Sequence, residues 1–335
     1  MAPRPVPKKR GGRRRCTHSI AGLDDAFQAV LRGHTAGDPM REEVRWTDLT
    51  LTQIAAHLLA RQTPVSVTVV RQLLKRHGYV KRKAQKNLPL GQHPNRNQQF
   101  LNITRLRSEY EASPNPILSI DTKKKELLGN FYRDGKLYTL ETIETLDHDF
   151  PSAASGVIIP HGLYDLKRNH GHINLGLSHD TSQFACDSLY RWWQTHGQAN
   201  YPSATSVLLL CDGGGSNAAS RYVFEAALQE LANRMKIEIR VAHYPPYTSK
   251  YNLIEHRLFP HITRACRGVV FVSVGLVKQL MERAKTKTGL WVSVDIIAAN
   301  YPTGIKAPVG FKEKMPLVFD NLFPKWNYRA LPQSP

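Results

Sequence analysis

The pattern of apolar residues after residue 115 constrains the fold of this chain more than any other feature. Short apolar segments, such as Ile117 to Asp121 and Ser206 to Cys211, have the length and residue types of buried strands. We expect strands over residues 117–121, 156–164, 172–177, 206–211 and 237–241, and helices over residues 180–193, 222–234, 253–266 and 274–285. Strands in a run, followed by strands that alternate with helices, predict an α/β fold with a mixed sheet and flanking helices.

The segment from Thr50 to Gly78 has a different pattern, which predicts two short helices. Apolar residues recur at helical spacing over residues 51–59, and Thr50 and Gln53 have the spacing of a capping box. Ser66 is placed to cap a second helix, which ends in a basic turn before Gly78. Two short helices joined by a tight turn predict a small all-α helix-turn-helix domain over residues 46–80. A helical hairpin without a DNA-binding role would have the same pattern.

The distribution of charge favours DNA binding by this part of the chain. The net charge is +19, and residues 1–108 hold 21 Lys and Arg against 6 Asp and Glu. No acidic residue occurs between Leu49 and Ser108, whereas a solvated helix face usually mixes both signs. Such an excess favours a polyanionic partner, here double-stranded DNA. On the outer face of the second helix, the expected DNA contacts are Arg71, Gln72, Lys75 and Arg76.

Composition also suggests domain boundaries and a cellular location. We expect residues 1–45 to form a basic, disordered arm, residues 81–115 a linker, residues 116–300 the α/β domain and residues 301–335 a C-terminal tail. Within the arm, residues 19–32 could form a short helix, and within the linker the pattern predicts a helix over residues 100–112. The four cysteines are far apart, which fits a reducing compartment, and the sequence predicts neither a signal peptide nor a membrane span. The expectation is a soluble cytoplasmic protein that associates with a prokaryotic nucleoid.

Three acidic residues have placements that suit a metal centre. Asp121 and Asp212 each follow a predicted buried strand, and Glu255 lies in the first turn of a predicted helix. Sites in open α/β sheets gather at the carboxyl ends of strands, and three hard oxygen ligands suit two Mg²⁺ ions, with Mn²⁺ as a substitute. Two such ions roughly 3.5–4 Å apart promote phosphoryl transfer. Taken singly, each acid could equally be a turn former, a helix cap or a partner of the helix dipole.

The remaining candidate residues carry weaker signals. The glycines after Asp212 lack the GK[ST] ending of a nucleotide-binding loop, which argues against an ATPase. The histidines show no zinc spacing and are interpreted as surface or core residues. Basic residues near the acids could hold DNA phosphates, although each could also be a solvated surface side chain: Lys123, Lys250, Arg257, Lys285 and Lys287.

Several of these segments resemble the ISAzo-type insertion-sequence transposases, which are DDE enzymes related to retroviral integrases. The resemblance extends in order over roughly residues 45 to 330. It is carried by SIDTKKKELLGNF (119–131), HDFP (148–151), GLYDL (162–166), CDGGGSN (211–217), HYPPYTSKYNLIEHRLF (243–259), TKTGL (286–290) and WNY (326–328). The family commonly shows GTSKWN where this chain has YTSKYN, and residues 1–44 resemble it poorly.

This resemblance implies a ribonuclease H-like catalytic domain with Asp121, Asp212 and Glu255 as catalytic and metal-binding residues. It further implies a transposase, acting as a homo-oligomer (a dimer) on DNA. Such an enzyme cuts at the ends of a mobile element, and the freed 3′-hydroxyl then attacks target DNA. Two alternatives stay open from the residues alone: a catalytically silent DNA-binding protein derived from a transposase, and a stand-alone DNA nuclease.

Overall fold

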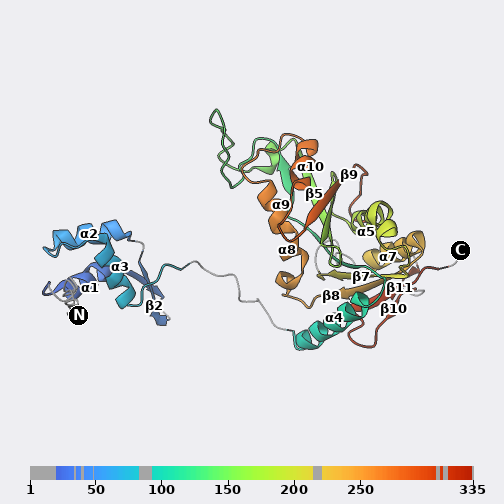
Figure 1. Ribbon diagram of the computed structural model, residues 1–335, viewed down its shortest axis with the longest axis horizontal. Coiled ribbons are helices and arrows are strands. Elements are labelled where there is room, and N and C mark those ends of the chain that lie inside the picture. Colours follow the sequence, from blue (N-terminus) through green and yellow to red (C-terminus); the bar gives the residue numbers. More distant parts are fainter. Residues whose placement is uncertain are drawn as a thin grey trace, which may run out of the picture. The chain divides into compact units, whose positions relative to one another are not determined.

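The chain folds into two compact units, residues 1–87 and 88–335 (Figure 1). The computed structural model describes residues 20–33, 35–38, 41–47, 49–82, 93–213, 221–306, 310–311 and 316–333. Within these described ranges, no helix combines the length and apolarity needed to cross a lipid bilayer. The two units are considered separately below.

The first unit is a cluster of three short helices with a β-hairpin. Its elements are α1 (Leu23–Gly33), β1 (Thr35–Asp38), β2 (Arg41–Thr47), α2 (Leu51–Ala60) and α3 (Val67–Arg76). Apolar residues of the three helices form one core that includes Phe27, Leu58 and Leu73. The predicted caps are confirmed, because Thr50 and Gln53 form a capping box and the Ser66 hydroxyl accepts a hydrogen bond from Val69 N. Side-chain capping thus fixes where α2 and α3 begin.

This unit differs from the sequence-based expectation in two ways. Residues 1–45 are expected to be a disordered arm in which a short helix could form over residues 19–32, and that helix forms as α1, which supplies Leu23 and Phe27 to a folded core. The domain is expected to be all-α, but β1 and β2 pair as an antiparallel hairpin. The apolar spacing in α1 matches a helix that needs the other two to bury its face, so the folded unit starts well before residue 46. Residues 1–19 lie outside the described part of the chain.

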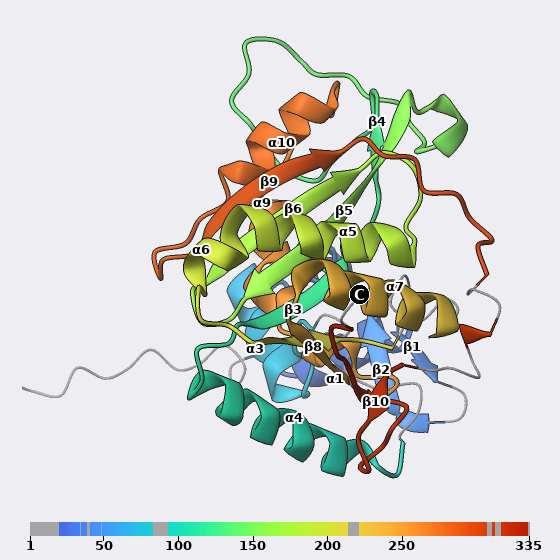
Figure 2. The ribbon, with the colours of Figure 1, turned by 90° about the vertical axis from the view of Figure 1, so that its right-hand side faces the viewer.

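The second unit is built on a nine-stranded mixed sheet (Figure 2). The strands run in the order β10-β11-β8-β7-β3-β5-β6-β9, with β4 paired to β5 off this path. Their bounds are β3 (Ile117–Thr122), β4 (Glu126–Leu128), β5 (Gly156–Asp165), β6 (His170–Gly176), β7 (Ser206–Cys211), β8 (Glu238–His243), β9 (Trp291–Ile297), β10 (Val318–Phe319) and β11 (Asn327–Ala330). Strands β3, β5 and β6 are antiparallel neighbours, whereas β3, β7 and β8 are parallel. The predicted α/β fold with a mixed sheet and flanking helices is confirmed.

Helices cover both faces of this sheet. They are α4 (Arg96–Glu111), α5 (Ser182–Trp192), α6 (Gln198–Asn200), α7 (Arg221–Met235), α8 (Ile254–Arg257), α9 (Phe259–Ala265) and α10 (Val274–Glu282), with short 3₁₀ or π turns at Pro151–Ala153, Trp193–Gly197 and Ser249–Tyr251. One core joins α5 and α7 to the central strands, and a second joins α8, α9 and α10 to β5, β6 and β9. The acids expected to form the site lie in this unit.

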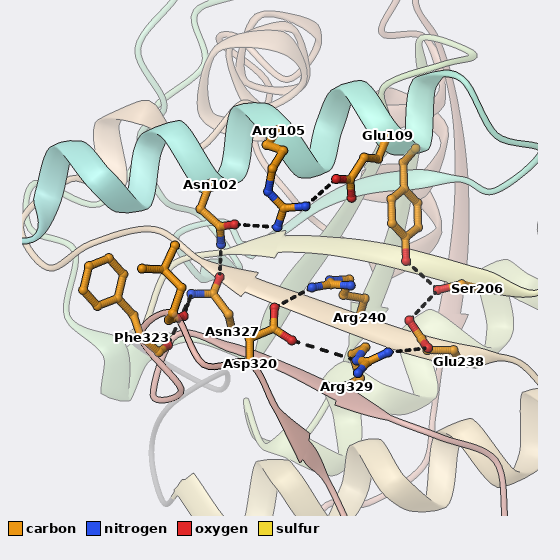
Figure 3. A network of polar contacts seen from close by, with 12 residues as sticks. Asn102, Arg105, Glu109, Ser206, Glu238, Arg240, Asp320, Phe323, Asn327 and Arg329 are labelled. Carbon is orange, nitrogen blue, oxygen red and sulfur yellow. Dashed lines mark hydrogen bonds and ion pairs between the residues drawn. The ribbon is translucent and has the colours of Figure 1, made fainter.

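The expected linker and the expected tail both contribute to the second unit. Helix α4 lies within residues 81–115 and packs Ile103, Leu106 and Tyr110 against β3, β7 and β8. Strands β10 and β11 lie within residues 301–335, and β11 pairs with β8. Figure 3 shows the polar network that joins these parts. Sequence-distant side chains meet there, so neither segment behaves as an independent connector.

Buried amides and ion pairs make up this network (Figure 3). Asn327 on β11 accepts hydrogen bonds at Oδ1 from Gln99 Nε2 and Asn102 Nδ2 on α4, both at 2.9 Å. Arg240 on β8 pairs with Asp320, and Arg329 on β11 lies 3.7 Å from Glu238 Oε2. Because buried polar groups cost free energy unless they are paired, this arrangement specifies how α4, β8 and β11 fit together.

The helix expected over residues 253–266 is interrupted. It forms as α8 and α9, with Leu258 in a non-helical conformation between them (φ −123°, ψ −60°). Pro260 lies two residues after Leu258 and cannot donate the backbone hydrogen bond that a continuous helix would need. Glu255 consequently lies on a single helical turn that the sheet positions.

Candidate active site

Two strand ends bring Asp121 and Asp212 to the same edge of the sheet. Asp121 belongs to β3 and Asp212 follows β7, its parallel neighbour. The register pairs Ser119 with Leu210, so two residues further it sets Asp121 opposite Asp212. The carboxyl ends of parallel strands share one edge, which is why this pattern in a sequence can be read as a site.

Glu255 reaches the same edge through a clamp between α8 and β3. The Ser119 hydroxyl donates to Asn252 Oδ1 (2.5 Å) and accepts from the backbone N–H of Ile254 (3.0 Å). Asn252 Nδ2 in turn donates to Ile120 O (3.2 Å) and lies 3.4 Å from Asp121 Oδ2. Ser119 and Asn252 are fully buried. These bonds fix the start of α8, at Ile254, against the strand that carries Asp121. Glu255 is the next residue of α8.

A glycine in β5 allows α8 and α9 to approach the sheet this closely. Gly162 is the register partner of Asp121. A Cβ atom added to Gly162 would lie 2.6 Å from Phe259 Cε1 and 2.9 Å from Ile254 Cδ1. A side chain at this position would therefore push α8 and α9 away from the strand.

Electrostatics shows that the three carboxylates sense one another. The pKa of Asp121 is raised to about 7. Burial is the largest cause, and the negative charges of Asp212 and Glu255 act in the same direction. The groups that stabilise its charged form are two hydrogen-bond donors, Thr122 N and the amide of Asn252. Burial also raises the pKa of Glu255, and Asp212 adds to that effect, whereas His256 and Lys123 oppose it. Like charges held together in this way are stabilised by a bound cation.

The donor set suits a hard divalent cation. All three candidates offer carboxylate oxygens, which Mg²⁺ and Mn²⁺ prefer, and each is partly accessible to solvent. In the described part of the chain, the one group of three potential ligands whose atoms all lie within 4.8 Å of one another is formed by histidines elsewhere. The three acids are thus spaced more widely, as expected for charges that repel one another without an ion between them.

A histidine of β8 supports the backbone at Asp212. His243 Nδ1 lies 3.1 Å from Asp212 O, which can only accept, so Nδ1 carries the hydrogen. Nε2 must then accept from the Tyr328 hydroxyl at 2.9 Å. Strand β11 therefore contributes to the position of Asp212 through this chain of two hydrogen bonds.

The predicted DNA contacts fall into three groups. Arg71, Gln72, Lys75 and Arg76 are exposed on α3, and Arg76 lies 3.6 Å from Asp24 on α1. Lys250, Arg257, Lys285 and Lys287 are exposed in the second unit. Lys123 differs, since it pairs with Glu126 and only 12% of its side chain is exposed. Lys123 is thus engaged within the fold, and it lowers the pKa of Glu255.

The structure adds residues near the acids that the sequence pattern did not single out. Arg96 at the start of α4 donates from Nη2 to the Tyr251 hydroxyl at 3.1 Å. Its guanidinium lies 5.4 Å from the centre of the Tyr251 ring, and Lys250 Nζ lies 5.3 Å from the same ring. The only signal for Asn252 was the resemblance to the family's GTSKWN motif, from which Tyr251 departs, because a polar residue before a helix is ordinarily interpreted as a cap.

Comparison with known proteins gives one family match and several distant structures. Residues 26–332 match a family model described as the Rhodopirellula transposase DDE domain. The Mos1 strand transfer complex is 15% identical over 85% of this chain and 76% of that chain, with a TM-score of 0.45. The mariner Mos1 paired-end complex with Mg is 17% identical over 85% and 77%, also with a TM-score of 0.45. No curated protein sequence matches the chain.

Proposed function

The chain belongs to this family of DDE transposases, and from that premise we propose that it cuts DNA at the ends of a mobile element and joins the freed 3′-ends to target DNA. The observation that carries the proposal is the gathering of Asp121, Asp212 and Glu255 at one sheet edge, where the charge of Asp212 raises the pKa of both other acids. A structural role for each acid would not require all three to converge.

The three acids would hold divalent cations, with Mg²⁺ as the natural ion. When bound, such ions activate the attacking oxygen and stabilise the leaving oxygen of a phosphodiester. The clamp formed by Ser119 and Asn252 would hold Glu255 in place during the reaction. In the first step the oxygen of a water attacks phosphorus, and the bond to the 3′-oxygen breaks. In the second, that 3′-hydroxyl attacks a target phosphodiester and releases a target 3′-hydroxyl.

Two groups of residues would bind the DNA. The exposed polar face of α3 would contact the element's end, because its basic and amide side chains can reach both phosphates and base edges. Arg96, Lys250 and Tyr251 would hold phosphates beside the acids, since two cations lie over an aromatic ring there. We further propose that the active form on DNA is a homodimer.

The test is the variant Asp212→Asn with an end-containing duplex and Mg²⁺. The substitution removes one carboxylate with little change of shape, so cleavage should fall by at least about 10³-fold while DNA affinity is unchanged. Asp134→Asn, which changes an exposed acid in the same unit, is the matched control and should cut normally. Cleavage by Asp212→Asn at the control's rate would show that the site is wrongly assigned.

The same assay separates transposase from nuclease. Labelled ends that become joined to a target plasmid indicate strand transfer, whereas products that stop at hydrolysis indicate a nuclease. A purified protein that binds ends but neither cuts nor joins them would be a DNA-binding derivative.

A further inference from the structure

A cluster of three histidines lies near β6 and β9, at one end of the sheet. Strand β5 separates these strands from β3 and β7, which position Asp121 and Asp212. His170 and His172 are two residues apart on β6, so their side chains lie on the same face. His196 comes from the π-helical turn that follows α5, and this turn brings it over that face. Single turns of π-helix are rare in proteins, and those that occur are frequently found at functional sites. Figure 2 shows β6 and β9 side by side beneath α5 and α6.

The ring nitrogens of these residues converge on one point. One nitrogen from each histidine lies within 4.8 Å of the other two. Ser293 on β9 is the register partner of His172, and its hydroxyl lies 2.8 Å from His170 Nε2, 2.7 Å from His172 Nδ1 and 3.0 Å from His196 Nε2. A hydroxyl has one hydrogen to donate and two lone pairs, so this oxygen is fully used by three rings.

The surroundings hold two of these rings in place. His172 Nε2, on the far side of its ring, lies 3.9 Å from Asp295 Oδ2, beyond hydrogen-bonding distance, so the carboxylate acts on this ring through its charge. His170 stacks on Trp291 with ring centroids 3.5 Å apart, which fixes the plane of its ring.

We propose that His170, His172 and His196 bind one Zn²⁺ ion in a tetrahedral site. The fourth coordination position faces Ser293. Zn–N bonds of about 2.0–2.1 Å place tetrahedral ligands roughly 3.3 Å apart. The Ser293 hydroxyl now lies at the point on which the three nitrogens converge, so metal binding requires this side chain to turn away and the nitrogens to close inward on the ion. His196 and Trp291 are partly exposed, which gives the ion a route from solvent.

Such an ion would connect three elements that otherwise meet at this point through hydrogen bonds and ring contacts. It would link β6, β9 and the turn after α5, and so fix the edge of the sheet on the side away from β8. The donor set also separates it from the acids, because three imidazoles select Zn²⁺ whereas carboxylates suit Mg²⁺. The role is structural, and the ion takes no part in the proposed DNA chemistry.

The test titrates Zn²⁺ into untagged, EDTA-treated full-length protein and measures affinity, stoichiometry and melting temperature. An Asp121→Asn/Asp212→Asn background removes binding by the acids. One ion per chain should bind in this background and in the control His148→Ala, which changes an exposed histidine. His196→Ala, and His196→Gln to keep the bulk, should weaken binding by more than about 100-fold. Zn²⁺ should raise the melting temperature of the background protein and of the His148→Ala control, but not that of the His196 variants.

Cobalt gives an independent readout. Co²⁺ bound by three imidazoles in a four-coordinate site should give strong visible absorption, which the His196 variants should lose while keeping the circular dichroism of the folded protein. Ser293→Ala should still bind Zn²⁺, because the three imidazoles remain. The proposal is overturned if no saturable binding occurs, or if the His196 variants bind as tightly as His148→Ala. A Ser293→Ala variant that loses binding would equally contradict three-histidine ligation.

Discussion

The two units of the chain are held together in different ways. In the first unit, contacting residues are closer in the sequence than in the second. The hydrogen bond that joins α1 to the end of α3, between Asp24 and His77, spans 53 residues. In the second, the decisive contacts are distant, such as Ser119 with Asn252 over 133 residues and Gln99 with Asn327 over 228. A DNA-binding surface needs only an exposed, charged helix, whereas a catalytic centre needs atoms placed to within a fraction of an ångström. The difference in construction matches the roles proposed for the two units, DNA binding for the first and catalysis for the second.

The largest effect that would sharpen this comparison is expected from Asn252→Ala. The substitution leaves the Ser119 hydroxyl, Ile254 N and Ile120 O with fewer partners in a fully buried site. The free energy of unfolding of the second unit should fall by about 2–3 kcal/mol, and cleavage should fall by more than about 100-fold. Urea denaturation and the cleavage assay measure both. Asn97→Ala, at an exposed position of α4, is the control, and equal behaviour of the two variants would rule out the clamp.

The double variant Arg71→Ala/Lys75→Ala should have the opposite profile. Both side chains are exposed on α3, so the free energy of unfolding should change by less than about 0.5 kcal/mol. Affinity for end DNA should fall by roughly 10–100-fold, and the slope of log affinity against log salt should decrease by about 2. Fluorescence anisotropy at several salt concentrations provides the measurement. Lys278→Ala, on α10 in the second unit, should bind DNA normally.

Asp121→Asn should stabilise the metal-free protein while it abolishes cleavage. The pKa of Asp121 is raised to about 7, so the folded state holds a proton that the unfolded chain releases near pH 4. Stability is therefore lost as pH rises from about 4 to 7, and the penalty is complete above pH 7. In EDTA at pH 8 the variant should gain about 1–2 kcal/mol, and at pH 4 almost nothing. A gain that is independent of pH would contradict this explanation.

The smallest effect is expected in the first unit, from Asp24→Asn. Hydrogen bonding to His77 lowers the pKa of Asp24, so its stabilising contribution is present above its usual pKa and is lost as pH falls through the folded value. The Asp24 side chain is 42% exposed, which limits the contribution to at most about 0.5 kcal/mol. Thermal melting at pH 7 and pH 3 should show a small difference between variant and parent at pH 7 alone. A large loss would mean that the local contacts of this unit matter more than proposed.

The sequence predicted local features well and distant pairings poorly. Strand β7 has the predicted bounds, and the caps of α2 and α3 form as expected, because these depend on a few neighbouring residues. Strands β9 and β11 were not predicted. Strand β11 is short, and its residues Asn327 to Ala330 acquire their role only from β8 and α4. Pro260 carried a usable signal for the break between α8 and α9.

The candidate site shows the same division. Asp121, Asp212 and Glu255 could be selected from their positions at strand and helix ends, since carboxylates there need a partner. Asn252 could not, because its partner Ser119 lies 133 residues earlier. The histidine cluster was also missed, since His196 is separated from His170 and His172 by a helix and no fixed spacing describes the three.

The pairing of β11 with β8 has a consequence for the order of events during synthesis. A ribosome releases β8, and with it His243, long before Tyr328, which accompanies β11. Until then the β8 edge is unpaired and the hydrogen-bonded support of Asp212 lacks its last member. We expect a nascent chain to complete the proposed DNA-cutting centre only after residues 327–330 have emerged. Translation itself would thus delay an activity that is hazardous to the genome encoding it.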